Sequence, residues 1–565
     1  MRWAEKRCAR ASECGASDGC ISGSRAIFAI NPASAVASPG ANRKPVRPGS
    51  TNSGIPPISL PQFLLAAAAD RGDRPALIDG LSGRVTSYGQ FAALVGRVAA
   101  GFAAHGLRKG QVVAILAPNC PDWLITAYGA MTAGGVVTGI NPLYTPAEVA
   151  GQLSGSGARF LVTIPPFLST ARAAIQQTGG AVEIVVLDEP APGTIAFADL
   201  LAHGDTPPDV TIDPAVDLAL LPFSSGTSGL PKGVQLTHRA CVANVLQQSA
   251  AFRYSTTGRV LAVAPFFHAV GFAVIANAAL HAGAAVVTMP RFEIETFLRL
   301  VEHHRITATV VVPPIVLALA KHPAVDRYDL SSLHWIGCGA APLGAELQQA
   351  CAQRLGRPVL QGYGMTELTA AAALWPLDTP VIPGAVGVLL PGVRARIVHP
   401  TTGADLGPDE TGELWLRSAA AMTGYINDSL ATAATVDADG WLHTGDIARI
   451  DADGAVFVVD RVKELIKVKG FQVAPAELEA VLRTHPCIAD AAVVGVPDER
   501  AGERPKAFVV RAGDVPVGAD EIHAYVAERV AAHKRVHDVE FIDAIPTSPA
   551  GKTLRRMLRA RGGAR

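Results

Sequence analysis

Strongly apolar runs typical of β-strands alternate with Ala- and Leu-rich stretches of helical spacing over residues 67–381, and this alternation constrains the fold more than any other feature. Strands joined in this way by helices form parallel sheets with helices on their faces. The helical stretches include Ala92–His105 and Leu343–Leu355. The apolar runs include Val112–Ala117, Phe160–Ile164, Ile184–Leu187, Val260–Ala264 and Thr309–Val312. The sequence therefore predicts an α/β fold with a large domain of helix-covered, mostly parallel sheets.

The pattern changes after Gly384 and again after Asp460. Short strands separated by Gly, Pro and Asp predict a small β subdomain, with strands at Arg394–Val398, Gly412–Leu416 and Phe457–Val459. A unit of about a hundred residues follows, an ordinary domain size. In it, Pro475 suits the first turn of a helix. We predict an N-terminal domain over residues 56–460 and a small, mobile α+β C-terminal domain over residues 461–565.

Composition restricts the class of protein. Residues 1–55 are rich in Ala, Ser, Gly, Pro and Arg without periodicity, which predicts a disordered extension. A formal net charge of zero gives no global field that favours nucleic acid or an anionic membrane. The eight cysteines show no CxxC or zinc spacing, which favours reduced thiols and a cytoplasmic location. Pro265, His268 and Asn277 interrupt the apolar stretch Val260–Met289, so it predicts strand, loop, buried helix and strand rather than a transmembrane helix.

A glycine-rich loop, Ser224–Gly233, follows an apolar run, Leu218–Phe223, that predicts one buried strand. Glycines let the backbone turn sharply and approach a ligand, and consecutive N–H groups in such a turn bind anions. Ser and Thr hydroxyls add donors, and Lys232 adds a charge suited to phosphate. The composition predicts a phosphate cradle, although alone it also fits a glycine-rich surface loop. It is not a Walker A loop, because Gly233 follows the lysine.

The loop resembles the phosphate-binding loop of the adenylate-forming superfamily, which includes acyl-CoA synthetases, 4-coumarate:CoA ligases and firefly luciferase. Further segments are similar to motifs of the same superfamily and follow in the same order across most of residues 60–556. They are Gln361–Glu367, Gly412–Arg417, His443–Asp446, Asp460–Lys467, Lys469–Glu477 and Pro549–Lys552. On these motifs the chain is identified as a member of the superfamily.

The resemblance implies the residues that bind ATP. The phosphates would lie on Ser224, Ser225, Gly226, Thr227, Ser228, Gly229 and Lys232. The adenine pocket would comprise Gly339, Ala340, Ala341, Pro342, Gln361, Gly362, Tyr363, Gly364 and Met365, with the Tyr363 ring packed against the base. Asp446 and Arg461 would bind the ribose hydroxyls.

The resemblance also implies roles in two half-reactions. Thr366 would donate to the α-phosphate, and Glu367 would hold Mg²⁺. Lys552 would bridge the substrate carboxylate and the α-phosphate during adenylation. The small domain would then rotate about a hinge at Lys463. Lys467 would serve the second half-reaction, and Gly470 would line the thiol entrance.

His268 is the ambiguous residue of the set. A lone histidine in an apolar run is usually a core residue, but the resembling enzymes have an active-site histidine in this motif, beside the carboxylate and the thiol route. In plant 4-coumarate ligases a tyrosine two positions later helps to hold the phenolic ring, and here Val270 replaces it. Together with the small apolar stretch Leu368–Ala373, this predicts an apolar pocket for a hydrophobic acid, a fatty acid foremost.

These features predict a ligase that uses ATP, Mg²⁺ and CoA. It would convert a carboxylic acid to an acyl-adenylate and then transfer the acyl group to CoA. The alternatives are an acyl-AMP ligase that loads a carrier protein, a 4-coumarate or aryl-CoA ligase, and a luciferase-like oxidising enzyme. A nucleotide-binding protein without catalysis is disfavoured, because the residues expected to carry the chemistry are all present: Lys232, Glu367, Asp446 and Lys552.

Overall fold

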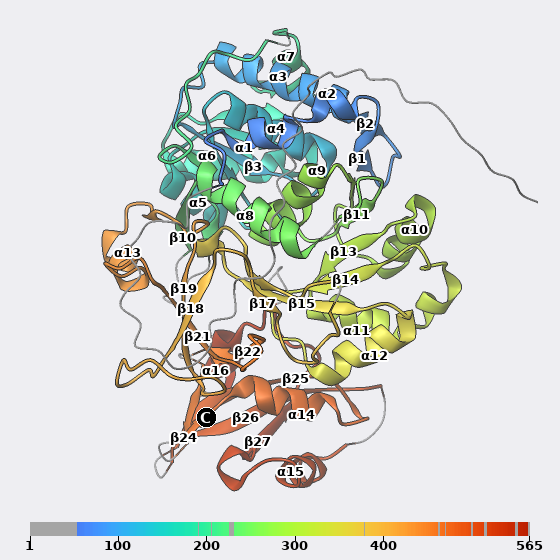
Figure 1. Cartoon of the computed structure of the whole chain (residues 1–565), viewed down its shortest axis with the longest axis vertical. Coiled ribbons are helices and arrows are strands. Elements are labelled where there is room, and N and C mark those ends of the chain that lie inside the picture. The colour runs from blue at the N-terminus through green and yellow to red at the C-terminus, as the bar shows by residue number, and fades with distance from the viewer. Residues whose placement is uncertain are drawn as a thin grey trace, which may run out of the picture. The chain divides into compact units, whose positions relative to one another are not determined.

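The computed structural model describes residues 54–189, 191–204, 206–224, 231–252, 254–377, 379–461, 464–468, 471–498, 501–513, 517–547 and 552–562. The prediction for residues 1–55 therefore falls almost wholly outside the described residues. Within these ranges the chain builds two nine-stranded sheets, a four-stranded sheet and a five-stranded sheet (Figure 1). No helix in the described ranges is both long and apolar enough to span a membrane.

The first nine-stranded sheet is parallel in its centre and antiparallel at both edges. In spatial order the strands are β17 (Val388–Leu389), β16 (Ala371–Leu374), β15 (Val359–Gly364), β14 (Trp335–Cys338), β13 (Ala308–Val311), β11 (Arg259–Ala262), β12 (Ala285–Thr288), β1 (Pro75–Asp79) and β2 (Val85–Ser87). Because the central strands β11 to β14 are almost fully buried, they are continuous apolar runs in the sequence.

The second nine-stranded sheet also has a parallel centre, and its antiparallel edge carries the glycine-rich loop. Its order is β20 (Gly424–Tyr425), β10 (Lys232–Thr237), β8 (Leu218–Leu220), β4 (Val136–Gly139), β3 (Val112–Leu116), β5 (Ala158–Thr163), β6 (Glu183–Val186) and β7 (Ile195–Ala196), while β9 (Phe223–Ser224) pairs with β10.

The prediction of one buried strand over Leu218–Phe223 is wrong in detail. The run forms two strands, β8 and β9, separated by Leu221 and Pro222, and Phe223 is only half-buried. Pro222 lacks an N–H and fixes its own φ, so it cannot continue a ladder in the middle of a sheet. Both strands still pair with β10, with Leu220 opposite Leu236 and Ser224 opposite Lys232, so the break interrupts the strand without changing its partner.

Helices cover the sheets as the alternating pattern predicts. Figure 1 shows α11 and α12 beside β14 and β15. In α10 the apolar side chains Phe297, Leu298 and Val301 recur at helical spacing and are buried against β11 and β12. The α-helices before the four-stranded sheet are α1 (Leu60–Leu65), α2 (Ala68–Arg71), α3 (Tyr88–Ala104), α4 (Pro121–Thr132), α5 (Pro146–Ser156), α6 (Leu168–Thr178), α7 (Phe197–Leu201), α8 (His238–Ala251), α9 (Ala278–Ala282), α10 (Ile294–His304), α11 (Pro313–Lys321) and α12 (Ala345–Leu355).

The stretch Val260–Met289 folds as strand, loop, buried helix and strand, which confirms that prediction. Its helix begins as a π-helix, η2 (Val270–Asn277), and continues as α9. At Gly271 a Cβ atom would lie only 2.1 Å from the carbonyl oxygen of Pro265, so only glycine fits there. This close backbone approach ties the first turn of η2 to the segment that carries His268.

The four-stranded sheet is antiparallel and consists of β18 (Arg394–Val398), β19 (Gly412–Arg417), β21 (Leu442–Ile450) and β22 (Val456–Arg461), with α13 (Ser429–Thr435) before β21. The described part of the chain after Arg461, here called the C-terminal segment, has its own apolar core. It contains β23 (Ile466–Val468), β24 (Phe471–Val473), α14 (Pro475–Arg483), β25 (Ile488–Asp498), β26 (Gly502–Arg511), α15 (Ala519–Ala527), β27 (Asp538–Phe541) and α16 (Arg555–Gly562).

Candidate active site

Glu367 lies in a short 3₁₀ helix, η4 (Thr366–Leu368), just after the carboxyl end of β15. Its side chain is buried, and its Oε1 accepts hydrogen bonds from the Ser224 hydroxyl and the Tyr425 hydroxyl, both at 2.9 Å. A glycine is required just before it, because a Cβ at Gly364 would lie 1.8 Å from the Ala370 carbonyl oxygen. The glycine-rich hairpin and the β15 loop therefore meet at this carboxylate.

Lys232 lies at the other end of the hairpin. Its Nζ is 3.3 Å from a carboxylate oxygen of Asp428 and 5.2 Å from the centre of the Tyr425 ring. Burial and the neighbouring Glu367 carboxylate raise the pKa of the Tyr425 hydroxyl, which stays a neutral hydrogen-bond donor. The residues predicted for the middle of the loop, Ser225, Gly226, Thr227, Ser228 and Gly229, lie outside the described residues.

Sequence reasoning missed Tyr425 and Asp428. Tyr425 sits on β20, which has only two residues and pairs with β10 through Val234 and Gln235. A two-residue strand has too few side chains to show a period, and its partner is almost two hundred residues away in the chain.

Asp446 is the centre of a second polar cluster. Its carboxylate is buried, with Oδ2 accepting from the Tyr363 hydroxyl at 2.5 Å and Oδ1 lying 3.1 Å from Nε of Arg461. Asp446 and Arg461 face each other across β21 and β22. Burial, and next the Asp446 carboxylate, raises the pKa of Tyr363 far above its usual 10. Each oxygen of the Asp446 carboxylate has two lone pairs, of which the contact to Tyr363 or to Arg461 uses one, so each can accept a further hydrogen bond from a ribose hydroxyl.

The predicted adenine-pocket segments lie on neighbouring strands. Gly339–Pro342 follows β14, and the predicted Gln361–Met365 spans the end of β15 and the residue after it. Ala340 adopts a left-handed φ of 69°, an uncommon conformation for a residue with a side chain that is often found at functional sites. Buried Gln361 donates to the Leu343 carbonyl and to Gln348, which fixes the two segments together. The predicted packing of Tyr363 against adenine stays a prediction.

The charged residues of this site act on Lys552, although Lys552 is exposed to water. The protein around it, and next the charge of Arg461, lowers its pKa below the usual 10.5, while Asp446 and Glu367 act in the opposite direction. The charges of both carboxylates therefore act on this lysine near the C-terminus. His268 is half-buried just before η2, and burial followed by the charge of Lys552 lowers its pKa to about 4. His268 is therefore neutral at pH 7.

The remaining predicted site residues are Thr366, Lys467, Lys463 and Gly470, and the structure describes only the first two. Thr366 is half-buried at the start of η4, next to Glu367. Lys467 lies on β23 with an exposed side chain, and its backbone N–H donates to Glu503 at 2.8 Å. Glu367 and Asp446 act on the pKa of Lys552, and its role in the first half-reaction stays a prediction. Lys463 and Gly470 lie outside the described residues.

Comparisons with known proteins agree with this geometry. The sequence model of the AMP-binding enzyme family matches residues 64–426, and that of the AMP-binding enzyme C-terminal domain matches residues 477–552. The chain is 44% identical over 529 residues to 4-coumarate–CoA ligase 5 of Oryza sativa subsp. japonica, covering 90% of this chain and 96% of the relative. It is 42% identical over 514 residues to the 4-coumarate–CoA ligase of Pinus taeda, covering 89% and 95%.

Solved structures show the same fold. ATP-bound MatB from Rhodopseudomonas palustris superposes with a TM-score of 0.82 at 29% identity, covering 90% of this chain and 99% of MatB. The anthranilate CoA ligase AuaEII in complex with anthranoyl-AMP superposes with a TM-score of 0.84 at 25% identity, covering 90% and 98%. These matches confirm the predicted α/β fold with a smaller C-terminal domain.

The chain belongs to the AMP-binding enzyme family of adenylate-forming proteins. Its activity is that of an AMP-forming carboxylate–CoA ligase, which takes ATP, CoA and a small-molecule acid as substrates. The prediction of a fatty acid as that substrate gains no support from these relatives. They favour the alternative, a 4-coumarate or aryl-CoA ligase.

Proposed function

We propose that the chain activates an aromatic, cinnamate-like carboxylic acid and transfers it to CoA. The 4-coumarate ligases above, each covered over nearly its whole length, support this choice of acid. The anthranilate ligase in complex with its acyl-adenylate supports an aromatic ring more generally. The fatty-acid prediction rests on Val270, which stands where the plant enzymes have a ring-binding tyrosine, and on the small apolar stretch Leu368–Ala373.

The observation that supports the mechanism is that the charges of Arg461, Asp446 and Glu367 all act on the pKa of Lys552. In the first half-reaction a carboxylate oxygen of the acid attacks the α-phosphorus of ATP, and pyrophosphate leaves. Two anions must approach each other, so a cation between them stabilises the transition state. We assign this role to Lys552, with Thr366 donating to the α-phosphate and Asp446 with Arg461 holding the ribose.

The second half-reaction transfers the acyl group. The CoA sulfur attacks the acyl carbonyl carbon, the bond from that carbon to the phosphate oxygen breaks, and AMP leaves. Neutral His268 adds no charge beside the acid, and its imidazole can accept a hydrogen bond from an incoming group. We keep Lys467 as the lysine of this step, as its motif implies.

A magnesium ion fits the residues present. Among the described residues, no three His, Cys, Asp or Glu side chains gather into a protein-only metal site. Mg²⁺ is commonly held by one or two carboxylates plus substrate phosphates. Glu367 offers one buried carboxylate beside Ser224 of the glycine-rich hairpin. When bound, the ion would neutralise phosphate charge.

Pyrophosphate release tests this proposal. Purified protein is given ATP, Mg²⁺ and one acid from a panel of fatty acids of increasing length, benzoates and hydroxycinnamates, with and without CoA. We expect the highest kcat/KM with a hydroxycinnamate or cinnamate, and thioester as the product when CoA is present. A higher kcat/KM with a fatty acid would overturn the choice of acid, and release without thioester would favour a carrier protein as acceptor.

A further inference from the structure

Asp460 links the strand that carries Arg461 to the C-terminal segment that carries Lys552. It is the penultimate residue of β22, and its side chain is buried. Its Oδ1 accepts the N–H of Arg461 at 2.7 Å, and its Oδ2 accepts the N–H of Ala476 at 3.0 Å. Ala476 is the second residue of α14. One carboxylate therefore accepts hydrogen bonds from both sides of the junction between β22 and the C-terminal segment.

The start of α14 has no cap of its own. Its N-cap residue, Ala474, offers no side-chain acceptor, and Pro475 has no N–H. The N–H of Ala476 is therefore the first donor of the helix, and a carboxylate at this end also interacts favourably with the helix dipole. Asp460 supplies this acceptor from sixteen residues earlier in the chain. A small apolar cluster of Ile447, Leu465 and Ala474, with Val459 packed against it, supports the same junction.

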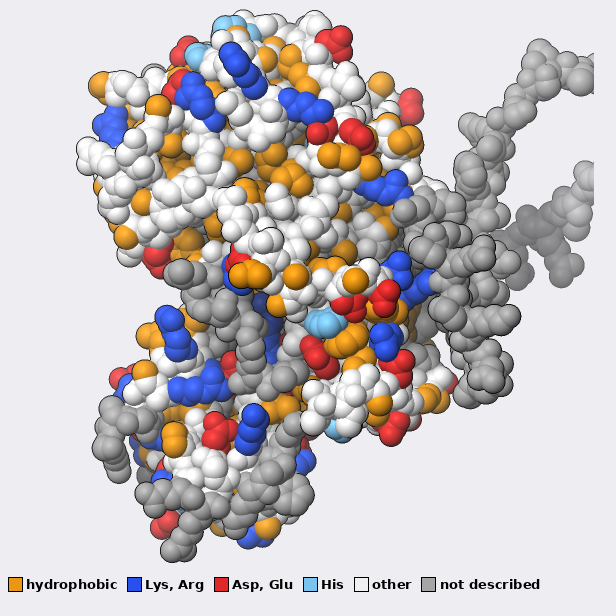
Figure 2. Space-filling model, turned by 90° about the vertical axis from the view of Figure 1, so that its left-hand side faces the viewer, with side chains coloured by type: hydrophobic (Ala, Val, Ile, Leu, Met, Phe, Trp, Pro, Cys, Tyr) orange, Lys and Arg blue, Asp and Glu red, His pale blue; other side chains and the backbone are white. Residues whose placement is uncertain are grey.

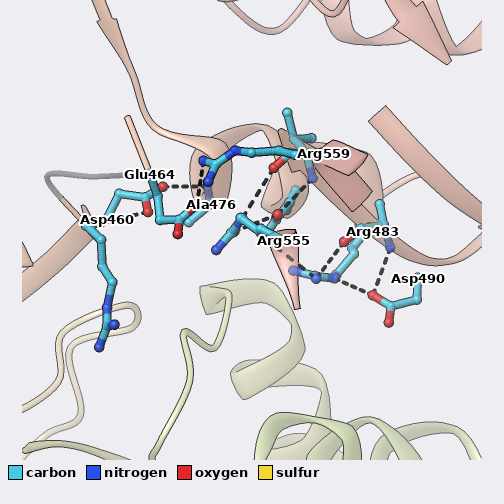
Figure 3. Close-up of polar contacts among 11 residues, drawn as sticks. Asp460, Glu464, Ala476, Arg483, Asp490, Arg555 and Arg559 are labelled. Carbon is cyan, nitrogen blue, oxygen red and sulfur yellow. Dashed lines mark hydrogen bonds and ion pairs between the residues drawn. The ribbon is translucent and has the colours of Figure 1, made fainter. Parts of the chain in front are cut away.

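A second set of contacts joins α14 to the helix that follows Lys552. The buried carboxylate of Glu479 accepts from Arg555 at 2.7 Å and from the N–H of Val493 at 2.9 Å. Arg559, further along α16, bonds to Glu464 at 2.7 Å. Figure 3 shows Arg555 and the contact of Arg559 with Glu464, together with Asp460 and Ala476. Arg555 is the first residue of α16, so its bond to Glu479 fixes the start of α16 to α14. Lys552 lies only three residues before Arg555.

We propose that Asp460 is a positioning residue for adenylation: by holding α14 it sets where the Glu479–Arg555 pair places Lys552. Asp460 does not need to touch the substrate, because its effect passes through α14 and α16. The inference rests on the proposed role of Lys552 in the first half-reaction. It predicts that loss of the Asp460 carboxylate slows adenylate formation selectively.

The test compares two half-reactions in the full-length protein. One assay follows pyrophosphate release from ATP and the best acid, and the other follows thioester formation from supplied acyl-adenylate and CoA. For Asp460→Ala we expect adenylation kcat to fall about tenfold, the effect of losing one hydrogen bond to a charged group. We expect the KM for ATP and the thioester rate to stay near wild type. Asp460→Asn, which keeps an oxygen acceptor, should restore most of the adenylation rate.

A double variant separates positioning from simple helix capping. Ala474 has the extended backbone of an N-cap, so Ala474→Ser gives α14 a local cap. In the Asp460→Ala background it should restore thermal stability but leave adenylation slow, because the bond across the junction is still missing. Full recovery of adenylation would overturn the proposal. Ser87→Ala, which removes the N-cap of α3, is the matched control and should lower stability without separating the two half-reactions.

Other outcomes are equally informative. Equal losses in both half-reactions would show a merely structural role. A higher KM for ATP with unchanged kcat would show that Asp460 acts through Arg461 instead. Lys552→Ala is measured in parallel: if that variant adenylates normally, the proposed function fails, whereas a slow Lys552→Ala with a normal Asp460→Ala refutes this inference alone.

Discussion

The buried His238 should lower the free energy of unfolding as the pH falls, because its pKa in the folded chain lies below the usual 6.5. His238 begins α8, is 1% exposed, and accepts the N–H of Leu60 on Nδ1 at 3.1 Å, which fastens α1 to α8. Burial lowers its pKa to about 4 from the usual 6.5, while Asp217 opposes this shift and Lys109 adds to it. Protonation would remove the acceptor and leave a charge in the core.

The sign follows from proton binding. Between pH 6.5 and 4 the unfolded chain binds the proton and the folded chain does not, so stability is fully present above pH 6.5 and falls as the pH is lowered. With these pKa values the free energy of unfolding at pH 5 should be about 2 kcal/mol lower than at pH 7 on account of His238 alone.

Urea unfolding of wild type and His238→Asn at pH 7 and pH 5 measures this difference. Asn places an oxygen near the position of Nδ1 but does not titrate, and all other titrating groups are common to both proteins. We expect wild type to lose about 2 kcal/mol more than the variant between the two pH values. Equal losses in the two proteins would refute the reasoning.

Two further substitutions test the site. Tyr425→Phe removes a hydrogen bond to the Glu367 carboxylate. The kcat/KM for ATP in pyrophosphate release should therefore fall about tenfold, the usual effect of losing a hydrogen bond to a charged group, and an unchanged value would show that this bond does not support ATP use. Val270→Tyr restores the ring-binding side chain of the plant enzymes. The ratio of kcat/KM for 4-coumarate to that for cinnamate should rise about fivefold, as one neutral hydrogen bond allows, whereas a constant ratio would mean that the ring does not lie beside position 270.

The regular elements were predictable because their patterns are local. The strand at Arg394–Val398 and the start of α14 at Pro475 agree with the structure. On the face that Figure 2 shows, Lys and Arg side chains are interspersed with Asp and Glu, in keeping with the formal net charge of zero. Apolar runs and proline positions carry this information because each depends on neighbours in sequence.

Other features depend on contacts between distant segments. The π-helical start of η2 is set by the close approach of Gly271 to Pro265, which no periodicity reveals. The Tyr363–Asp446 bond joins strands of two different sheets. The resemblance supplied both residues but assigned them to different parts of the nucleotide.

The role of Lys552 is the central claim, and the half-reactions of Lys552→Ala test it most directly. Lys321→Ala, at the exposed end of α11, is the matched lysine control. We expect Lys552→Ala to form acyl-adenylate about 10² to 10³ times more slowly, the usual effect of removing a transition-state charge partner. Thioester formation from supplied acyl-adenylate should match wild type. Adenylation by Lys552→Ala at the rate of the Lys321→Ala control would contradict the account.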